Sequence, residues 1–150
     1  MPPLTLSSPQ ATAALAARIA PLLRPGDTLL LSGPIGAGKT AFARALIQAR
    51  LGRAEDVPSP TFTLVQTYDD GICEIWHADL YRLTVPEDAV ELGLEQAFAE
   101  AICLVEWPDR LGDLRPEGAL ALDFAAGETA HSLAFEAPAA WRDRLEPALG

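Results

Sequence analysis

Four residues in the first third of the chain form a pattern that can hold a phosphate chain. Gly33, Gly38, Lys39 and Thr40 satisfy GxxxxGK(S/T), with an apolar run directly before them and a predicted helix directly after. Glycines let successive backbone N–H groups turn toward an anion, and a helix that begins there adds the positive end of its dipole. Lys39 supplies a point charge for the terminal phosphates, and the Thr40 hydroxyl can occupy one position of an octahedral Mg²⁺. The pattern therefore predicts a site for the β- and γ-phosphates of a nucleotide.

A magnesium ion at such a site also needs carboxylate help, usually from the end of a neighbouring buried strand. Glu106 follows "AICLV", the most apolar strand-like segment that ends in an acid, and Asp79 follows "CEIWHA", whose composition is more mixed. The pattern alone favours Glu106 and keeps Asp79 as the second candidate. His77 and His131 carry less information, because a single histidine is more often hydrogen-bonded in place than engaged in proton transfer.

The segment after the predicted phosphate-binding helix can respond to the nucleotide. "DVPSP", Asp56 to Pro60, contains two prolines, which fix the backbone and remove N–H donors, so it must be a loop. Ser59 or Thr61 could present a hydroxyl to the γ-phosphate from this loop, because a loop can move where a sheet cannot. The sequence does not choose between the two.

The elements that must position these residues follow from apolar patterning. Strands are expected over Leu4 to Ser8, Asp27 to Gly33, Thr61 to Tyr68, Ile72 to Ala78 and Ala101 to Glu106, and in a last hairpin that turns at Gly127. Helices are expected from Pro9 with Ser8 as the cap, from Lys39 to Leu51 with Gly52 as the stop, in "VPEDAVELGLEQAFAE" with a bend near Gly93, and in "AAWRDRLEPAL". This order predicts a single α/β domain with three layers, a mixed sheet flanked by helices, with added antiparallel strands.

Composition excludes several classes of protein. The 150 residues, 49% of them hydrophobic, suit one globular domain, and no segment approaches the roughly 18 apolar residues of a membrane span. "MPPLTLSSPQ" has no basic region followed by an apolar core, so we expect no signal peptide and a cytoplasmic protein. The net charge of −10, from 21 acidic against 11 basic residues, opposes direct binding to a phosphate backbone. Cys73 and Cys103 lack metal-binding spacing and are expected to be buried thiols.

Together these segments resemble the TsaE (YjeE) family of small bacterial P-loop ATPases. The matching segments are "GPIGAGKTAF", "SPTFTLVQTY", "HADLYRL" and "VEWPDRL", in the family's order and at similar spacings across nearly the whole chain. "GAGKT" alone would indicate only a P-loop protein, whereas "SPTFTLV" with "HADLYRL" and "EWPD" is specific to this family. The resemblance implies a role in making threonylcarbamoyladenosine, the modification beside the anticodon of tRNAs that read codons beginning with A. It also implies ATP and Mg²⁺ as cofactors, the TsaD transferase and its companion TsaB as partners, and contact with tRNA only through them.

The resemblance also implies roles for individual residues. Thr40 and Glu106 would hold Mg²⁺, and the catalytic group would consist of Lys39 on the phosphates, Asp79 in a second acidic role and Thr61 in a switch-like loop. The cofactor-binding residues would be Gly33, Gly36, Ala37, Gly38, Lys39, Thr40 and Ala41.

Some positions depart from the family pattern. Pro34 and Ile35 stand where members often have Asp-Leu, and Ala41 stands where they often have a second threonine, but no phosphate or metal ligand is lost. The last hairpin lacks the arginine expected near Gly127, so its contact with adenine or phosphate stays open. The motifs contain no obvious arginine finger, so efficient hydrolysis would depend on a partner.

Two other functions fit the phosphate-binding pattern. A small-molecule kinase needs a lid with closing arginines, for which Arg110 and Arg115 lie in a plausible place, although the segments after Gly118 predict a hairpin instead. A nucleotide-gated binding module would use ATP to order the "VPSPTF" loop and create a face for a partner. Phosphate transfer to an acceptor would identify the first, and tight ATP binding without hydrolysis even with partners would identify the second.

Overall fold

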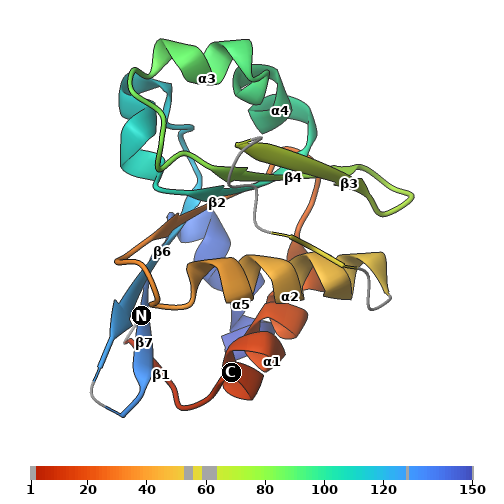
Figure 1. Cartoon of the computed structure of the whole chain (residues 1–150). Coiled ribbons are helices and arrows are strands. Elements are labelled where there is room, and N and C mark those ends of the chain that lie inside the picture. The colour runs from red at the N-terminus through yellow and green to blue at the C-terminus, as the bar shows by residue number, and fades with distance from the viewer. Residues whose placement is uncertain (1–2, 53–55, 59–63, 128, 150) are drawn as a thin grey trace.

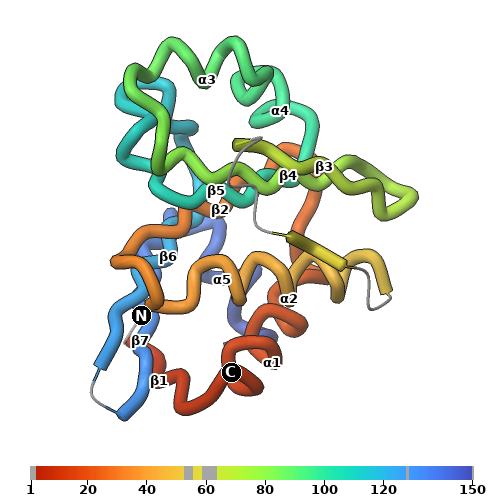
Figure 2. The backbone as a smooth tube through the Cα atoms, viewed as in Figure 1, coloured from red at the N-terminus to blue at the C-terminus, as the bar shows by residue number. Residues whose placement is uncertain are grey.

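The computed structural model describes residues 3–52, 56–58, 64–127 and 129–149. Their strands form one seven-stranded sheet in the order β1-β7-β6-β2-β5-β4-β3 (Figure 1). The strands are β1 (Leu4–Leu6), β2 (Thr28–Ser32), β3 (Val65–Asp69), β4 (Glu74–Asp79), β5 (Ile102–Glu106), β6 (Leu120–Ala126) and β7 (His131–Glu136). The four central strands β6, β2, β5 and β4 are parallel. Antiparallel strands extend both edges, β3 beside β4, and β7 and β1 beyond β6. Figure 2 shows β5 among these central strands, so the predicted mixed α/β sheet is confirmed.

Helices cover both faces of the sheet. One face carries α1 (Pro9–Ile19), the 3₁₀ turn η1 (Ala20–Leu22), α2 (Lys39–Leu51) and α5 (Ala139–Leu149). The other carries α3 (Glu87–Glu91), α4 (Leu94–Glu100) and the 3₁₀ segment η2 (Pro108–Leu114). Figure 1 shows these two groups on opposite sides of the central strands. In the described ranges no helix is long and apolar enough to cross a membrane.

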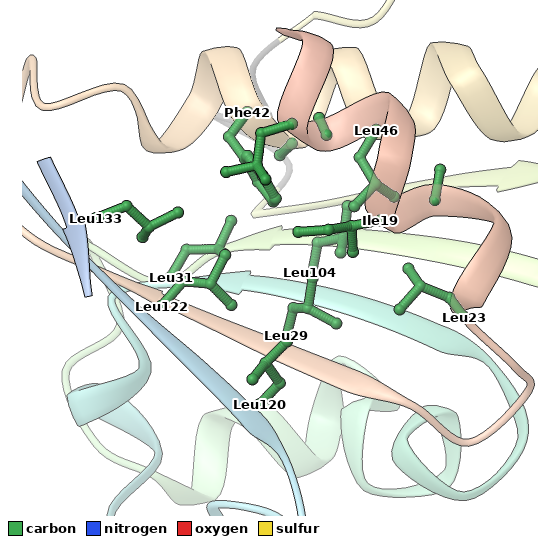
Figure 3. Close-up of a cluster of buried hydrophobic side chains, with 14 of the residues drawn as sticks. Ile19, Leu23, Leu29, Leu31, Phe42, Leu46, Leu104, Leu120, Leu122 and Leu133 are labelled. Atoms are coloured by element: carbon green, nitrogen blue, oxygen red, sulfur yellow. The ribbon is translucent and has the colours of Figure 1, made fainter. Parts of the chain in front are cut away.

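The larger core lies between the sheet and the α1, α2 and α5 helices. Figure 3 shows Ile19 of α1 and Leu46 of α2 pointing toward leucines of the central strands. Successive residues of β2 point to opposite faces of the sheet. Leu29 and Leu31 pack in this larger core, whereas Leu30 packs in the smaller core between the sheet and the α3 and α4 helices. The continuous apolar run that identified β2 therefore reflects a parallel strand covered on both faces.

Three predicted helix boundaries are confirmed. Ser8 caps α1, with its Oγ accepting from the Ala11 N–H at 3.1 Å. Gly52 ends α2 in the left-handed region, at φ 70°. Gly93, at φ 85°, separates α3 from α4 where a bend was expected.

Several strand boundaries differ from prediction by one or more residues. β1 ends at Leu6 and not at Ser8, because Ser8 is the cap of α1. β3 begins at Val65, after Leu64 in the left-handed region at φ 63°; residues 61–63 of the predicted strand lie outside the described residues. β4 begins at Glu74, two residues later than predicted, because the Asp70 carboxylate holds the Ile72 and Cys73 N–H groups in the turn at 2.8 and 2.9 Å. Cys73, whose N–H group belongs to this turn, is only half-buried, so the prediction of a buried thiol is wrong for Cys73 and confirmed for Cys103.

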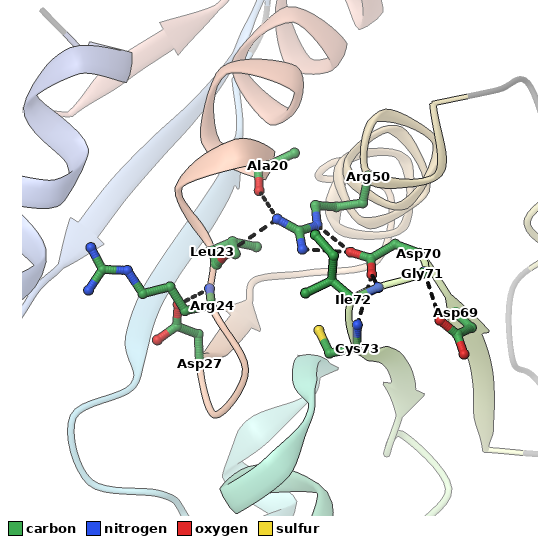
Figure 4. A network of polar contacts seen from close by, with 10 residues as sticks. All are labelled: Ala20, Leu23, Arg24, Asp27, Arg50, Asp69, Asp70, Gly71, Ile72 and Cys73. Atoms are coloured by element: carbon green, nitrogen blue, oxygen red, sulfur yellow. Dashed lines mark hydrogen bonds and ion pairs between the residues drawn. The ribbon is translucent and has the colours of Figure 1, made fainter.

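An ionic network ties the far end of α2 to two other segments (Figure 4). Arg50 donates from Nε and Nη2 to Asp70 Oδ2 at 2.9 and 2.6 Å, which links α2 to the β3–β4 turn. Its Nη1 donates to the carbonyls of Ala20 and Leu23 at 3.1 and 3.2 Å, which links α2 to the end of η1. The helix that starts at the phosphate-binding pattern is thus anchored at its other end.

Candidate nucleotide-binding site

The turn that leaves β2 requires glycine at its first position. Gly33 has φ 133°, and a Cβ there would lie 2.3 Å from the carbonyl oxygen of Phe124 on β6. Backbone cannot yield at such a distance, so any side chain would push the turn away from the sheet. The first glycine of the pattern therefore fixes the turn against its neighbouring strand.

Two further glycines lead into α2. Gly36 and Gly38 have φ 85° and 104°, in the left-handed region that glycine adopts without strain. The helix begins at Lys39, and its first intrahelical bond runs from the Phe42 N–H to the Gly38 carbonyl at 2.9 Å. The N–H groups of the first turn therefore lack intrahelical partners and lie at the positive end of the helix dipole, as an anion site requires.

Lys39 is held by its own loop and by an aromatic ring. The side chain is buried, and its Nζ donates to the Gly33 carbonyl. The same Nζ lies 3.6 Å from the ring centroid of Trp107, a cation–π distance. Trp107 reaches this place through a left-handed backbone at φ 59°, directly after β5, and the ring of Tyr81 packs against it at 5.0 Å. The ammonium group is thus fixed at the mouth of the glycine-rich turn.

Both candidate carboxylates lie beside this turn. Asp79 and Glu106 end β4 and β5 and are paired in the parallel register. Thr40 Oγ1 donates to Glu106 Oε1 at 2.8 Å, and Asp79 Oδ1 accepts from the Tyr81 N–H at 3.1 Å. The hydroxyl of the pattern and the favoured acid are therefore in direct contact, with the second acid on the neighbouring strand.

Burial opposes the charged forms of two of these groups. The pKa of Lys39 is lowered, because the loss of hydration outweighs the attraction of Glu106, Asp79 and Asp109. The pKa of Asp79 is raised, mainly by burial, and Glu106 adds repulsion, whereas the Tyr81 N–H, His77 and Lys39 act in the other direction. Bound phosphates would supply the anion for Lys39, and a bound cation would relieve Asp79.

These groups share one cavity of about 610 Å³. Its walls are formed by Ile35, Gly36, Gly38, Lys39, Thr40, Ala41, Asp79, Tyr81, Arg82, Glu106, Trp107 and His131. Among the described residues no three of the His, Cys, Asp and Glu side chains are grouped to hold a metal by themselves. A hydroxyl with one or two carboxylates suits Mg²⁺, which takes few protein ligands and completes its octahedron with phosphate oxygens and water.

The structure brings together most of the predicted site residues. Gly33 and Ala37 differ, because neither lines the cavity. Ala37 is buried, and Gly33 lies against Phe124 of β6 and accepts a hydrogen bond from Lys39. Thr61 and Ser59, the loop candidates, lie outside the described residues. Arg110 and Arg115, which a kinase lid would use, do not line the cavity.

Five wall residues lie outside the predicted site: Ile35, Tyr81, Arg82, Trp107 and His131. Tyr81 and Arg82 follow Asp79 within "DLYR", so their closeness in sequence to an acid at a strand end could have indicated them. His131 belongs to β7, and nothing local indicates that β7 reaches the glycine-rich turn. It also lines a second cavity of about 290 Å³ with Gly38, Ala41, Ser8 and Thr12.

Comparisons with known proteins identify the family of the chain. Residues 6–133 match the family described as "Threonylcarbamoyl adenosine biosynthesis protein TsaE". The tRNA threonylcarbamoyladenosine biosynthesis protein TsaE of Bacillus subtilis is 36% identical over 132 residues, which are 87% of this chain and 82% of that protein. The protein of the same name from Rickettsia conorii is 45% identical over 105 residues, 70% of this chain, but the match spans only 60% of that relative. The crystal structure of Bacillus subtilis YdiB superposes with a TM-score of 0.81 at 29% identity, covering 99% of this chain and 93% of that one.

Proposed function

Because the chain belongs to the TsaE family, we propose that it binds Mg-ATP and hydrolyses it in support of a TsaD/TsaB transferase that forms threonylcarbamoyladenosine in tRNAs reading codons that begin with A. The proposal includes a cytoplasmic location, where such tRNAs are read. The relatives' shared name supports the pathway, and the geometry of the cavity supports the nucleotide.

One observation carries the nucleotide proposal. The Thr40 hydroxyl contacts Glu106 at 2.8 Å, at the start of the helix whose first three residues line the same cavity. A glycine-rich turn with a solvated lysine would not need contact with a buried acid that lies 66 positions later in the chain. The contact instead joins an anion site to a cation site, as a metal–phosphate ligand requires.

Each residue then has a defined task. The first-turn N–H groups of α2 and the Lys39 ammonium group bind the β- and γ-phosphates. Thr40 and Glu106 hold Mg²⁺, which when bound neutralises charge on those phosphates. We assign the adjoining cavity of about 290 Å³ to the base and sugar, since it shares Gly38 and Ala41 with the phosphate site. Thr61 keeps its proposed role in the switch-like loop.

Hydrolysis needs a base for water, and Asp79 is the candidate. Its carboxylate lies on the cavity wall beside Glu106, where it can accept a proton from a water molecule at the γ-phosphate. Water oxygen bonds to the γ-phosphorus, the bond from that phosphorus to the β–γ bridging oxygen breaks, and Asp79 accepts the water proton. ADP and phosphate are the products.

Because the chain is strongly acidic, we assign the contact with tRNA to the partner proteins. A net charge of −10 repels a phosphate backbone, so the chain is proposed to act on the modifying complex and not on tRNA itself.

The pathway is tested by nucleoside mass spectrometry of tRNA from cells depleted of this protein. We expect threonylcarbamoyladenosine to fall and to be restored by the wild-type chain and by Arg142→Ala, which removes an exposed cation on α5, but not by Lys39→Ala. An unchanged modification level would refute the pathway role.

The nucleotide site is tested separately through its amine. Lys39 is the only lysine in the chain, so amine-reactive labelling of a side chain reports on this one group. ATP with Mg²⁺ should protect the peptide that contains Lys39, measured by mass spectrometry, and labelling that is insensitive to nucleotide would refute the site.

A further inference from the structure

A histidine is buried next to the candidate metal ligand. His77 is fully buried, and its Nε2 lies 2.7 Å from Oε2 of Glu106, whose side chain is 3% exposed. In the parallel register, Asp79 stands opposite Glu106 and His77 stands opposite Leu104. His77 therefore lies one pleat behind the carboxyl ends of β4 and β5, on the same face as Glu106.

The two oxygens of Glu106 have different partners. Oε1 accepts from the Thr40 hydroxyl at 2.8 Å, on the cavity side, and Oε2 faces the His77 ring behind it. An ionised carboxylate only accepts hydrogen bonds, so the His77 nitrogen that faces it must be the donor. One donor on each oxygen fixes the plane of the carboxylate.

The rest of the imidazole gains little from its surroundings. Across the part of the chain that the structure describes, His77 Nδ1 is buried and finds no hydrogen-bond partner. A buried nitrogen without a partner opposes folding, and an apolar side chain would fill the same space without that penalty. The contact with Glu106 is thus the polar interaction that distinguishes histidine from leucine here.

We propose that His77 is a positioning residue for Glu106: it holds Oε2 so that Oε1 is presented to Thr40 and to a bound divalent cation. The inference rests on the proposed function, because it takes Thr40 and Glu106 as the magnesium ligands. Partners behind a ligating carboxylate fix its orientation, and their removal lowers metal affinity by about 10–100-fold. The phosphate contacts of α2 and Lys39 do not involve His77.

The test compares four chains by the Mg²⁺ dependence of fluorescent ADP binding, with binding in excess EDTA as the second readout. In His77→Leu the Mg²⁺ concentration for half-maximal effect should rise by about tenfold or more, while binding in EDTA stays within about twofold of wild type. His77→Gln places an amide N–H near the position of Nε2 and should restore most of the Mg²⁺ affinity. Thr28→Val, a buried polar-to-apolar change at the other end of β2, should leave both readouts unchanged.

The outcomes separate the inference from the proposed function. A wild-type chain with no Mg²⁺-dependent ADP binding would refute the proposed metal–nucleotide site itself. A wild-type response with an unchanged Mg²⁺ requirement in His77→Leu would overturn the role of His77 alone.

A variant that fails to fold does not end the test. If His77→Leu loses its cooperative thermal transition, His77→Gln is compared with His77→Asn, whose amide is one methylene too short to reach Glu106. A higher Mg²⁺ requirement in the asparagine variant supports the positioning role, and equal requirements overturn it.

Discussion

Replacing Asp70 with asparagine should weaken the anchor at the far end of α2 without touching the cavity. The side chains of Arg50 and Asp70 are 11% and 2% exposed, and their closest atoms are 2.6 Å apart (Figure 4). Removing one partner of a buried pair costs about 3–5 kcal/mol. Arg50 keeps two carbonyl acceptors and asparagine keeps one oxygen, so we expect the lower end, about 3 kcal/mol of unfolding free energy. For a chain of this size that corresponds to a melting temperature lower by about 6–12 °C.

The effect should depend on pH in a defined direction. Burial alone would raise the pKa of Asp70, but hydrogen bonds from the Cys73 and Ile72 N–H groups and the contact with Arg50 outweigh it and lower the pKa below 3.8. A lowered folded-state pKa means that the carboxylate contributes its full stability above pH 3.8 and loses it as the pH falls through the folded value. The difference between wild type and Asp70→Asn should therefore be constant near neutrality and shrink in acid.

Urea unfolding at pH 7 and in acid measures both quantities. Asp69→Asn is the matched control, because Asp69 is the exposed neighbour and binds only the Gly71 N–H at 2.8 Å among the contacts drawn in Figure 4. It should change stability by less than about 0.5 kcal/mol. An Asp70→Asn loss below about 1 kcal/mol, or one that persists unchanged in acid, would show that the network in Figure 4 does not stabilise the fold in this way.

Two further predictions concern the cavity. Gly33→Ala should abolish nucleotide binding in a fluorescence titration and destabilise the fold, because the new Cβ would lie 2.3 Å from the Phe124 carbonyl oxygen. Gly118→Ala is the control, since Gly118 also has a positive φ but open space around it. It should lower the free energy of unfolding by only about 1–2 kcal/mol. Asp79→Asn should stop ATP hydrolysis yet raise the urea midpoint of the nucleotide-free protein at pH 7. A raised pKa penalises the charged form in the folded state, so the gain should vanish below pH 3.8, and an equal gain at both pH values would contradict it.

The local part of the site could be read from the sequence. The turn around Gly33 and Gly38 and the helix from Lys39 to Leu51 depend on residues that are neighbours in the chain, and both occur as predicted. Glycine is favoured at such turns because it adopts positive φ without strain, and a glycine after the last turn marks the end of a helix.

The contacts between residues that are far apart in the sequence could not be predicted. Patterning ranked Glu106 above Asp79, but β4 and β5 are separated by α3 and α4, and only their pairing places the two acids side by side. Trp107 reaches Lys39 through a left-handed backbone that no local residue preference indicates. His77 resembled an ordinary strand histidine, because its partner Glu106 lies 29 positions later in the chain.

The electrostatics of the cavity link stability to ligand binding. Burial disfavours the charged forms of both Lys39 and Asp79, so the folded polypeptide by itself holds these groups at a free-energy cost. A ligand that carries both a polyanion and a divalent cation relieves both penalties at once, whereas either component alone relieves one and intensifies the repulsion on the other. ATP and Mg²⁺ should therefore stabilise the fold more together than the sum of their separate effects. This cooperativity follows from the positions of Lys39 and Asp79 at one cavity and needs no conformational change.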